Sequence, residues 1–111
     1  MGETQYGYQA YYKPVNASAA SDNLIVTGVT GHSIRVINVV VQASGTVLTT
    51  WKTGLGASGV ALSGQMPQVA NTGYAPPEAA YGHFKCTSGD GLNLHLSAAV
   101  PVQGWVVYQL V

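Results

Sequence analysis

The residues best suited to chemistry in this chain are the histidines and the one cysteine. His83 and Cys86 stand three residues apart in the run HFKC, a spacing that looks like half of a metal site. On a β-strand, however, positions three apart point to opposite faces of the sheet. In the strand register that we favour below, His83 lies on the same outer face of the sheet as His95, with Lys85 beside it. Two histidines without a third ligand make a weak zinc site, so the sequence predicts no bound metal and no other cofactor.

Cys86 and the four acidic residues give little support for catalysis. A reactive thiol needs an exposed, electropositive setting, whereas Cys86 falls in phase with Phe84, toward the expected core. The acidic residues fall in an arm, a linker, a proline-rich loop and a turn: Glu3, Asp22, Glu78 and Asp90. No two of them share a strand as a pair suited to acid–base work. We therefore predict no catalytic residue and no enzyme. A hydrolase stays open only as a third class of function, because carboxylates on loops can converge.

The elements that must position these residues are short β-strands. Apolar and polar residues alternate with a period of two, and glycine, proline, asparagine and serine mark the turns. About eight strands are expected, over residues 6–12, 24–29, 33–42, 46–53, 59–64, 81–87, 92–98 and 102–111. Pro14 should end the first strand, and residues 65–80 should form a long irregular segment. The pattern predicts an all-β, single-domain antiparallel β-sandwich that is jelly-roll-like.

The run over residues 33–42 is apolar in both strand phases. One phase holds Ile37, Val39 and Val41, and the other holds Ile34, Val36 and Val40. A strand buried on both faces is central in its sheet and covered by a second layer or a partner.

The pairing of the strands over 81–87 and 92–98 has two possible registers if they form a hairpin. A two-residue loop would place Lys85 opposite Leu94. A three-residue loop with a bulge at Gly91 instead places Cys86 and Phe84 opposite Leu94 and Leu96. We favour the second register because it separates one apolar face from one polar face. If the two strands lie in opposite sheets, as a jelly roll allows, the same residues should still point inward.

The 111 residues are expected to form one domain, with a Tyr-rich arm and small-residue linker over 1–21 and the sandwich over 22–111. Only 7% of the residues are charged, and four basic residues balance four acidic ones. Nothing in this balance indicates electrostatic capture of nucleic acid or of an anionic membrane. The sequence shows no secretory signal and no apolar stretch of membrane-spanning length, so we expect synthesis in the cytoplasm.

A nearly uncharged surface favours association, and tyrosine and tryptophan are enriched in protein interfaces. The predicted partner-binding residues are the tyrosines of the arm, with one tyrosine and two prolines of the irregular segment: Tyr6, Tyr8, Tyr11, Tyr12, Tyr74, Pro76 and Pro77. Ordinary strand packing is the alternative role for the arm tyrosines. Exposed tyrosine with neutral amides would also suit the faces of carbohydrates, so sugar binding stays open as a second function.

Three runs carry a resemblance to a known family: SIRVINVVVQASGTV, ALSGQMP and GHFKCTSGDGLNLHLSAAVPVQGWVVYQL. From about Gly31 to Val111 the chain resembles the small all-β accessory proteins of tailed bacteriophages. The resemblance implies a capsid decoration protein, of the kind called cement or staple, on the outer surface of the virion. Such proteins sit there as dimers or trimers, bridge neighbouring major capsid subunits and stabilise the shell. Related modules occur in tails, so the alternative is a carbohydrate-binding adhesin module of a phage tail or fibre.

Overall fold

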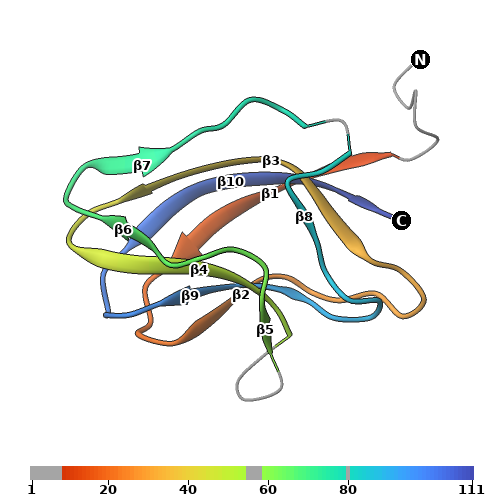
Figure 1. The fold of residues 1–111 in the computed structure, drawn as a ribbon, viewed down its shortest axis with the longest axis horizontal. Coiled ribbons are helices and arrows are strands. Elements are labelled where there is room, and N and C mark those ends of the chain that lie inside the picture. The colour runs from red at the N-terminus through yellow and green to blue at the C-terminus, as the bar shows by residue number, and fades with distance from the viewer. Residues whose placement is uncertain (1–8, 55–58, 80) are drawn as a thin grey trace.

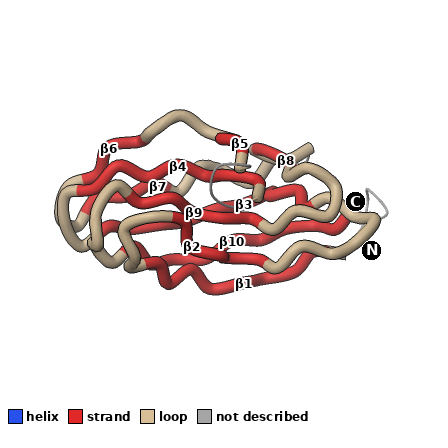
Figure 2. Tube along the Cα trace, turned by 90° about the horizontal axis from the view of Figure 1, so that it is seen from below, coloured by secondary structure: helices blue, strands red, loops and turns tan. Residues whose placement is uncertain are grey.

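The computed structural model of the protein describes residues 9–54, 59–79 and 81–111. The regular structure of these residues is all β, in two antiparallel sheets packed against each other (Figure 1). The longer strands run roughly along the long axis of a molecule of 40 × 29 × 20 Å (Figure 2). Their bounds are β1 (Ala10–Ala17), β2 (Asp22–Val26), β3 (Ile34–Ala43), β4 (Val47–Thr53), β5 (Val60–Ala61), β6 (Met66–Gln68), β7 (Thr72–Tyr74), β8 (Phe84–Lys85), β9 (Leu92–Leu96) and β10 (Val102–Leu110).

The order of the strands confirms the predicted jelly roll. The first sheet runs β1-β10-β3-β7, and the second runs β2-β9-β4-β5. The strands β8 and β6 extend the same two outer edges, because β8 also pairs with β3 and β6 also pairs with β4. The arrangement is therefore an eight-stranded jelly roll in which two edge strands are each broken in two. The segment 65–80, expected to be irregular, contains β6 and β7, whereas the run 81–87 contributes only the two residues of β8.

The core lies between the sheets and is built from the inward phase of the longer strands. Trp51 of β4 is fully buried at its centre, and its ring lies 5.9 Å from that of Phe84, centroid to centroid. Around this pair pack the inward valines, isoleucines and leucines of β1, β3, β9 and β10. Burying aliphatic side chains of this size stabilises the fold by about 2 kcal/mol each, before the cost of ordering the chain.

The apolar residues in both phases of β3 are explained by a bulge. Val107 of β10 pairs with Asn38, but its neighbour Tyr108 pairs with Val36, so Ile37 is an extra residue on β3. The inward phase therefore switches at this point, and β3 contributes Ile34 and Val36 on one side of the bulge and Val39 and Val41 on the other to the same core. The position of β3 in the middle of its sheet is confirmed, but the predicted assignment of its residues to two faces is wrong.

Pro14 lies inside β1 and does not end it. The strand continues to Ala17, and among the described strands it pairs only with β10, so β1 is an edge of the first sheet. Proline lacks a backbone N–H, and an edge strand is the place where that loss is tolerated. Val15 and Ala17 point into the core, so the sandwich begins at β1, and only residues 18–21 connect β1 to β2.

The strands β8 and β9 do not pair with each other. β8 pairs with β3 in the first sheet, and β9 lies between β2 and β4 in the second. Both hairpin registers are therefore wrong, but the inward phase is confirmed. Cys86 is buried, Phe84 packs against the core, and Leu92, Leu94 and Leu96 are fully buried.

Candidate functional site

The outer face of the first sheet carries apolar side chains on three neighbouring strands. Pro14 of β1 pairs with Trp105 of β10, which pairs on its other side with Val40 of β3. One step along the same face, Tyr12 pairs with Val107. We call these five residues the apolar patch.

The alternation of side chains along each strand shows which way the patch residues point. Val15, Val106 and Val39, which lie next to patch residues in sequence, are buried in the core. Because successive side chains point to opposite faces of a sheet, the patch residues point outward. Directly paired side chains lie close together, so the five form a continuous surface across the sheet.

The patch leaves two large aromatic residues open to solvent. The Tyr12 side chain is 65% exposed and Trp105 is 40% exposed, and no residue of the patch carries a charge. Tryptophan and tyrosine with few charges are the composition of the centre of a protein interface. The patch can bury apolar area against a partner, and its one ionisable side chain is the exposed phenol of Tyr12.

The two arm tyrosines that the structure describes point to opposite sides of β1. Tyr12 belongs to the patch. Tyr11 pairs with Tyr108, and the two rings stack with their centroids 5.5 Å apart. Burial raises the pKa of the Tyr108 hydroxyl. Tyr6 and Tyr8, which were also predicted to contact a partner, lie outside the described residues.

Tyr74 packs against the core, apart from the patch. Its hydroxyl accepts a hydrogen bond of 3.0 Å from the indole N–H of Trp51 and lies 3.4 Å from the Thr49 hydroxyl. Burial raises the pKa of Tyr74. Pro76 and Pro77 follow β7, at the opposite edge of the first sheet from β1. Of the described residues predicted to bind a partner, only Tyr12 therefore lies in the patch.

The other four patch residues were not predicted from the sequence: Pro14, Val40, Trp105 and Val107. A signal for Trp105 was present, because Val102 and Val106 set the inward phase of the last strand and leave residue 105 facing out. Pro14 and Val40 could not be assigned to the same face before the register was known. The pairing of β1, β10 and β3 is what brings them together.

Cys86 and the histidines do not form a reactive cluster. Cys86 is buried, and this burial raises the pKa of its thiol to about 11, so the thiol stays protonated at neutral pH. His83 precedes β8 in the first sheet, whereas His95 lies on β9 in the second, so they do not share the predicted outer face. Within the described residues, no group of three or more histidine, cysteine, aspartate and glutamate side chains could hold a metal ion.

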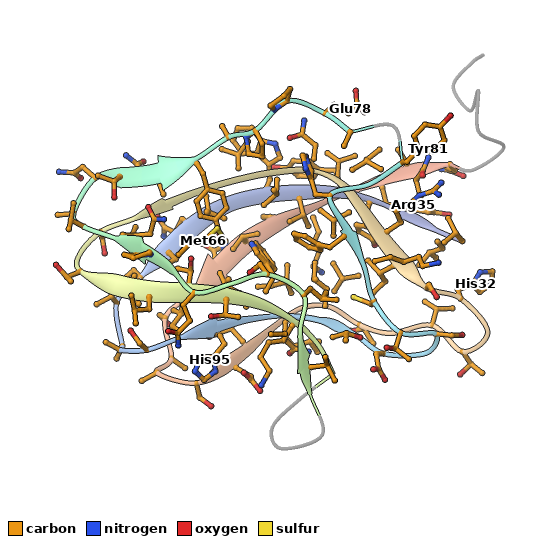
Figure 3. The ribbon with its side chains drawn as sticks, viewed as in Figure 1. His32, Arg35, Met66, Glu78, Tyr81 and His95 are labelled. Atoms are coloured by element: carbon orange, nitrogen blue, oxygen red, sulfur yellow. The ribbon has the colours of Figure 1, made fainter. Side chains whose placement is uncertain are left out.

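An ionic cluster that was not predicted from the sequence joins three strands of the second sheet. The Asp22 carboxylate on β2 accepts from His95 Nδ1 at 2.8 Å and from Lys52 Nζ on β4 at 3.3 Å. Asp22 is only 7% exposed and Lys52 16%, while His95 is 39% exposed. Figure 3 labels His95 beside β9. Asp22 was assigned to a linker, so no residue pattern connected it to His95, which lies 73 positions away.

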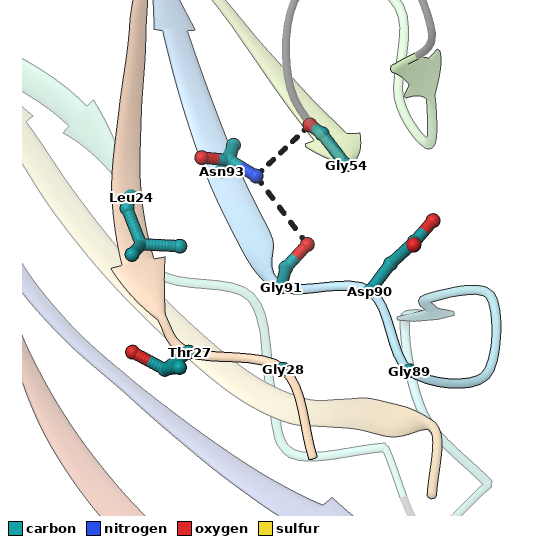
Figure 4. A pocket seen from close by; sticks show the side chains of 8 residues that line it. All are labelled: Leu24, Thr27, Gly28, Gly54, Gly89, Asp90, Gly91 and Asn93. Carbon is teal, nitrogen blue, oxygen red and sulfur yellow. Dashed lines mark hydrogen bonds between the residues drawn. The ribbon is translucent and has the colours of Figure 1, made fainter. Parts of the chain in front are cut away.

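Glycines line a polar hollow of about 340 Å³ beside the ends of β2, β4 and β9 (Figure 4). The Asn93 amide donates to the carbonyl oxygens of Gly54 and Gly91, and the Asp90 carboxylate accepts from the Thr53 hydroxyl. A Cβ atom on Gly28 would overlap the carbonyl oxygen of Gly89, so the chain approaches itself closely here. These bonds tie the loops of the second sheet together, and we assign this hollow a structural role.

No family model, curated protein or solved structure matches this chain. In the ranges that the structure describes, no helix is both long and apolar enough to span a membrane.

Proposed function

We propose that the protein is a non-enzymatic structural component of a phage virion. It binds the outer face of the capsid, bridges neighbouring major capsid subunits and stabilises the shell. It does so as a dimer or trimer, after synthesis in the cytoplasm of the host bacterium. The apolar patch supports this proposal most directly. The resemblance of residues 31–111 to capsid decoration proteins indicates that the partner is the major capsid protein.

The composition of the surface agrees with this role. With 7% charged residues, the protein has little electrostatic repulsion to keep copies apart, and an uncharged patch loses little free energy of hydration when it is covered. A ligand that binds only the assembled shell stabilises it by mass action. Several modest contacts on one shell add up to stable attachment through their high effective concentration.

Co-sedimentation with emptied phage capsids that lack this chain tests the proposal. The wild-type chain should sediment with the capsids, and Trp105→Thr or Tyr12→Thr should lower its affinity at least about tenfold, as expected for central aromatic contacts. The matched control is Val60→Thr on β5 of the second sheet, because Val60 is also exposed and apolar. Absence of the wild-type chain from the capsid pellet would contradict the proposal, as would equal losses for all three variants.

A carbohydrate-binding adhesin module is the second candidate, and the same two aromatic residues favour it. Tyr12 and Trp105 are exposed on the same outer face of the first sheet, and aromatic faces stack on the C–H faces of sugar rings. Under this candidate, a host polysaccharide would shift the indole N–H signal of Trp105 in a nuclear magnetic resonance titration. Capsids would then leave that signal unchanged.

A further inference from the structure

The outer face of the second sheet contains a hollow of about 350 Å³ beside the ionic cluster. Its lining comes from β4 and β9 (Thr50, Lys52 and His95) and from β5 and the segment after it (Ala61, Ser63, Gly64 and Gln65). We call it the His95 hollow. Its volume falls within the range of small-molecule sites, of about 300–1,000 Å³.

The bond to Asp22 determines which atom of His95 is available in the hollow. Asp22 is paired with Lys52 and is therefore an ionised, acceptor-only carboxylate. The proton of the neutral imidazole must then be on Nδ1, 2.8 Å from Asp22 Oδ1, and Nε2 is an acceptor. Within the part of the chain that the structure describes, Nε2 has no hydrogen-bond partner.

Thr50 supplies a second polar group at the same place. It pairs directly with His95 across β4 and β9, so both side chains stand on the same face of the sheet. Thr50 is only 8% exposed, and its hydroxyl makes no hydrogen bond with any described residue. A nearly buried hydroxyl beside an unpartnered imidazole acceptor offers one donor and one acceptor to a single ligand atom.

The charges of the cluster favour a neutral ligand. The charges of Lys52 and Asp22 cancel, so with a neutral imidazole ring on His95 the cluster carries no net charge. A carboxylate or phosphate would find no net positive charge here. An alcohol matches both groups, because it donates to Nε2 of His95 and accepts from the hydroxyl of Thr50.

We propose that the His95 hollow binds the hydroxyl groups of a neutral carbohydrate. The inference goes beyond the proposed function, since the hollow and the apolar patch lie on opposite outer faces of the sandwich. A chain attached to a shell through the patch would turn the hollow away from that shell, toward the surrounding medium.

A nuclear magnetic resonance titration of the free, full-length chain tests this site. The probes are the methyl glycosides of glucose, galactose and mannose, with sodium acetate as the anionic comparison. At least one glycoside should shift the imidazole signals of His95 and the backbone amide of Thr50 in a saturable way. Acetate should leave these signals in place.

Variants of Thr50 separate a hydrogen bond from packing. Thr50→Val keeps the shape and removes the hydroxyl, so it should weaken glycoside binding about five- to tenfold, the effect of one hydrogen bond. Thr50→Ser keeps the hydroxyl and should bind as wild type does. His32→Gln is the control for a histidine elsewhere, because His32 is exposed near one end of the molecule (Figure 3).

Three results would overturn the site. They are a response to acetate but to no glycoside, glycoside shifts confined to Trp105, and equal affinity of wild type and Thr50→Val. The titration uses no capsid, so failure of capsid attachment would leave this inference standing. Failure of the glycosides to bind would likewise leave capsid attachment untouched.

Discussion

Pro14 and Trp105 are direct cross-strand partners on the outer face of the first sheet, and the Trp105 side chain is 40% exposed. The proline weakens this edge as a template for further strand pairing, because it has no backbone N–H to donate. The tryptophan beside it offers a large apolar surface instead. This combination favours attachment through side chains on the face of the sheet over attachment through an added strand.

Tyr74→Phe should destabilise the fold by about 1–3 kcal/mol. The substitution removes the oxygen that accepts the indole N–H of the buried Trp51 at 3.0 Å, and a buried donor without a partner is costly. Urea denaturation followed by fluorescence measures the change. The control Tyr12→Phe removes an exposed hydroxyl and should change stability by less than about 0.5 kcal/mol. Equal effects of the two variants would show that the internal bond contributes nothing.

Stability should fall in alkaline solution because of Cys86. Burial raises the pKa of this thiol from 9.0 to about 11, so the folded state holds its proton more tightly than the unfolded state does. The resulting stabilisation is fully present below pH 9 and is lost as the pH rises toward 11, by at most about 3 kcal/mol. Unfolding free energies across this window measure it.

Cys86→Ala is the matched variant for that measurement. Its free energy of unfolding should not show the decrease that begins at pH 9. It should show only the later decrease from Tyr74 and Tyr108, whose pKa values are raised from 10.0. An unchanged pH dependence in the variant would assign the effect to other groups.

Asp22→Asn should destabilise the second sheet by about 2–4 kcal/mol. Asp22 is 7% exposed and pairs with Lys52 and His95, so the substitution leaves the Lys52 charge, itself 16% exposed, without its carboxylate. Thermal unfolding measures the loss. Glu78→Gln changes an exposed carboxylate and should leave the midpoint almost unchanged. A similar midpoint for both variants would mean that the cluster adds no stability.

Gly104→Ala should separate β10 from β3 and cost about 3 kcal/mol or more. A Cβ atom at this position would overlap the backbone carbonyl oxygen of Val40, which cannot move without disturbing the sheet. Gly64→Ala is the control, because a Cβ there has no neighbouring atom within 4 Å. Chemical denaturation compares the two, and a Gly104→Ala variant as stable as Gly64→Ala would contradict the close approach.

The fold class and the inward residues were predictable, because period-two alternation depends only on neighbours in sequence. The buried row Leu92, Leu94 and Leu96 and the inward Cys86 followed from that alternation. The bulge at Ile37 was not predictable, because an extra residue becomes visible only when β3 is aligned with β10.

The candidate sites were less predictable than the fold, because each is assembled across strands that are distant in sequence. The patch joins residues of β1, β3 and β10, and the ionic cluster joins residues of β2, β4 and β9. Tyr12 was found from its residue type alone. Pro14 and Asp22 were assigned to a strand end and a linker, so their contacts could not be anticipated.

Hydroxyl-radical footprinting of Trp105 on the assembled particle tests the central claim, that the apolar patch is covered by a capsid subunit. The free chain provides the reference, since its Trp105 is 40% exposed. Oxidation of Trp105 should fall several-fold on the particle, while oxidation of Tyr81, which is 81% exposed and lies outside the patch, serves to normalise the dose. Oxidation of Trp105 at the same rate on the particle and in the free chain would contradict the proposed attachment.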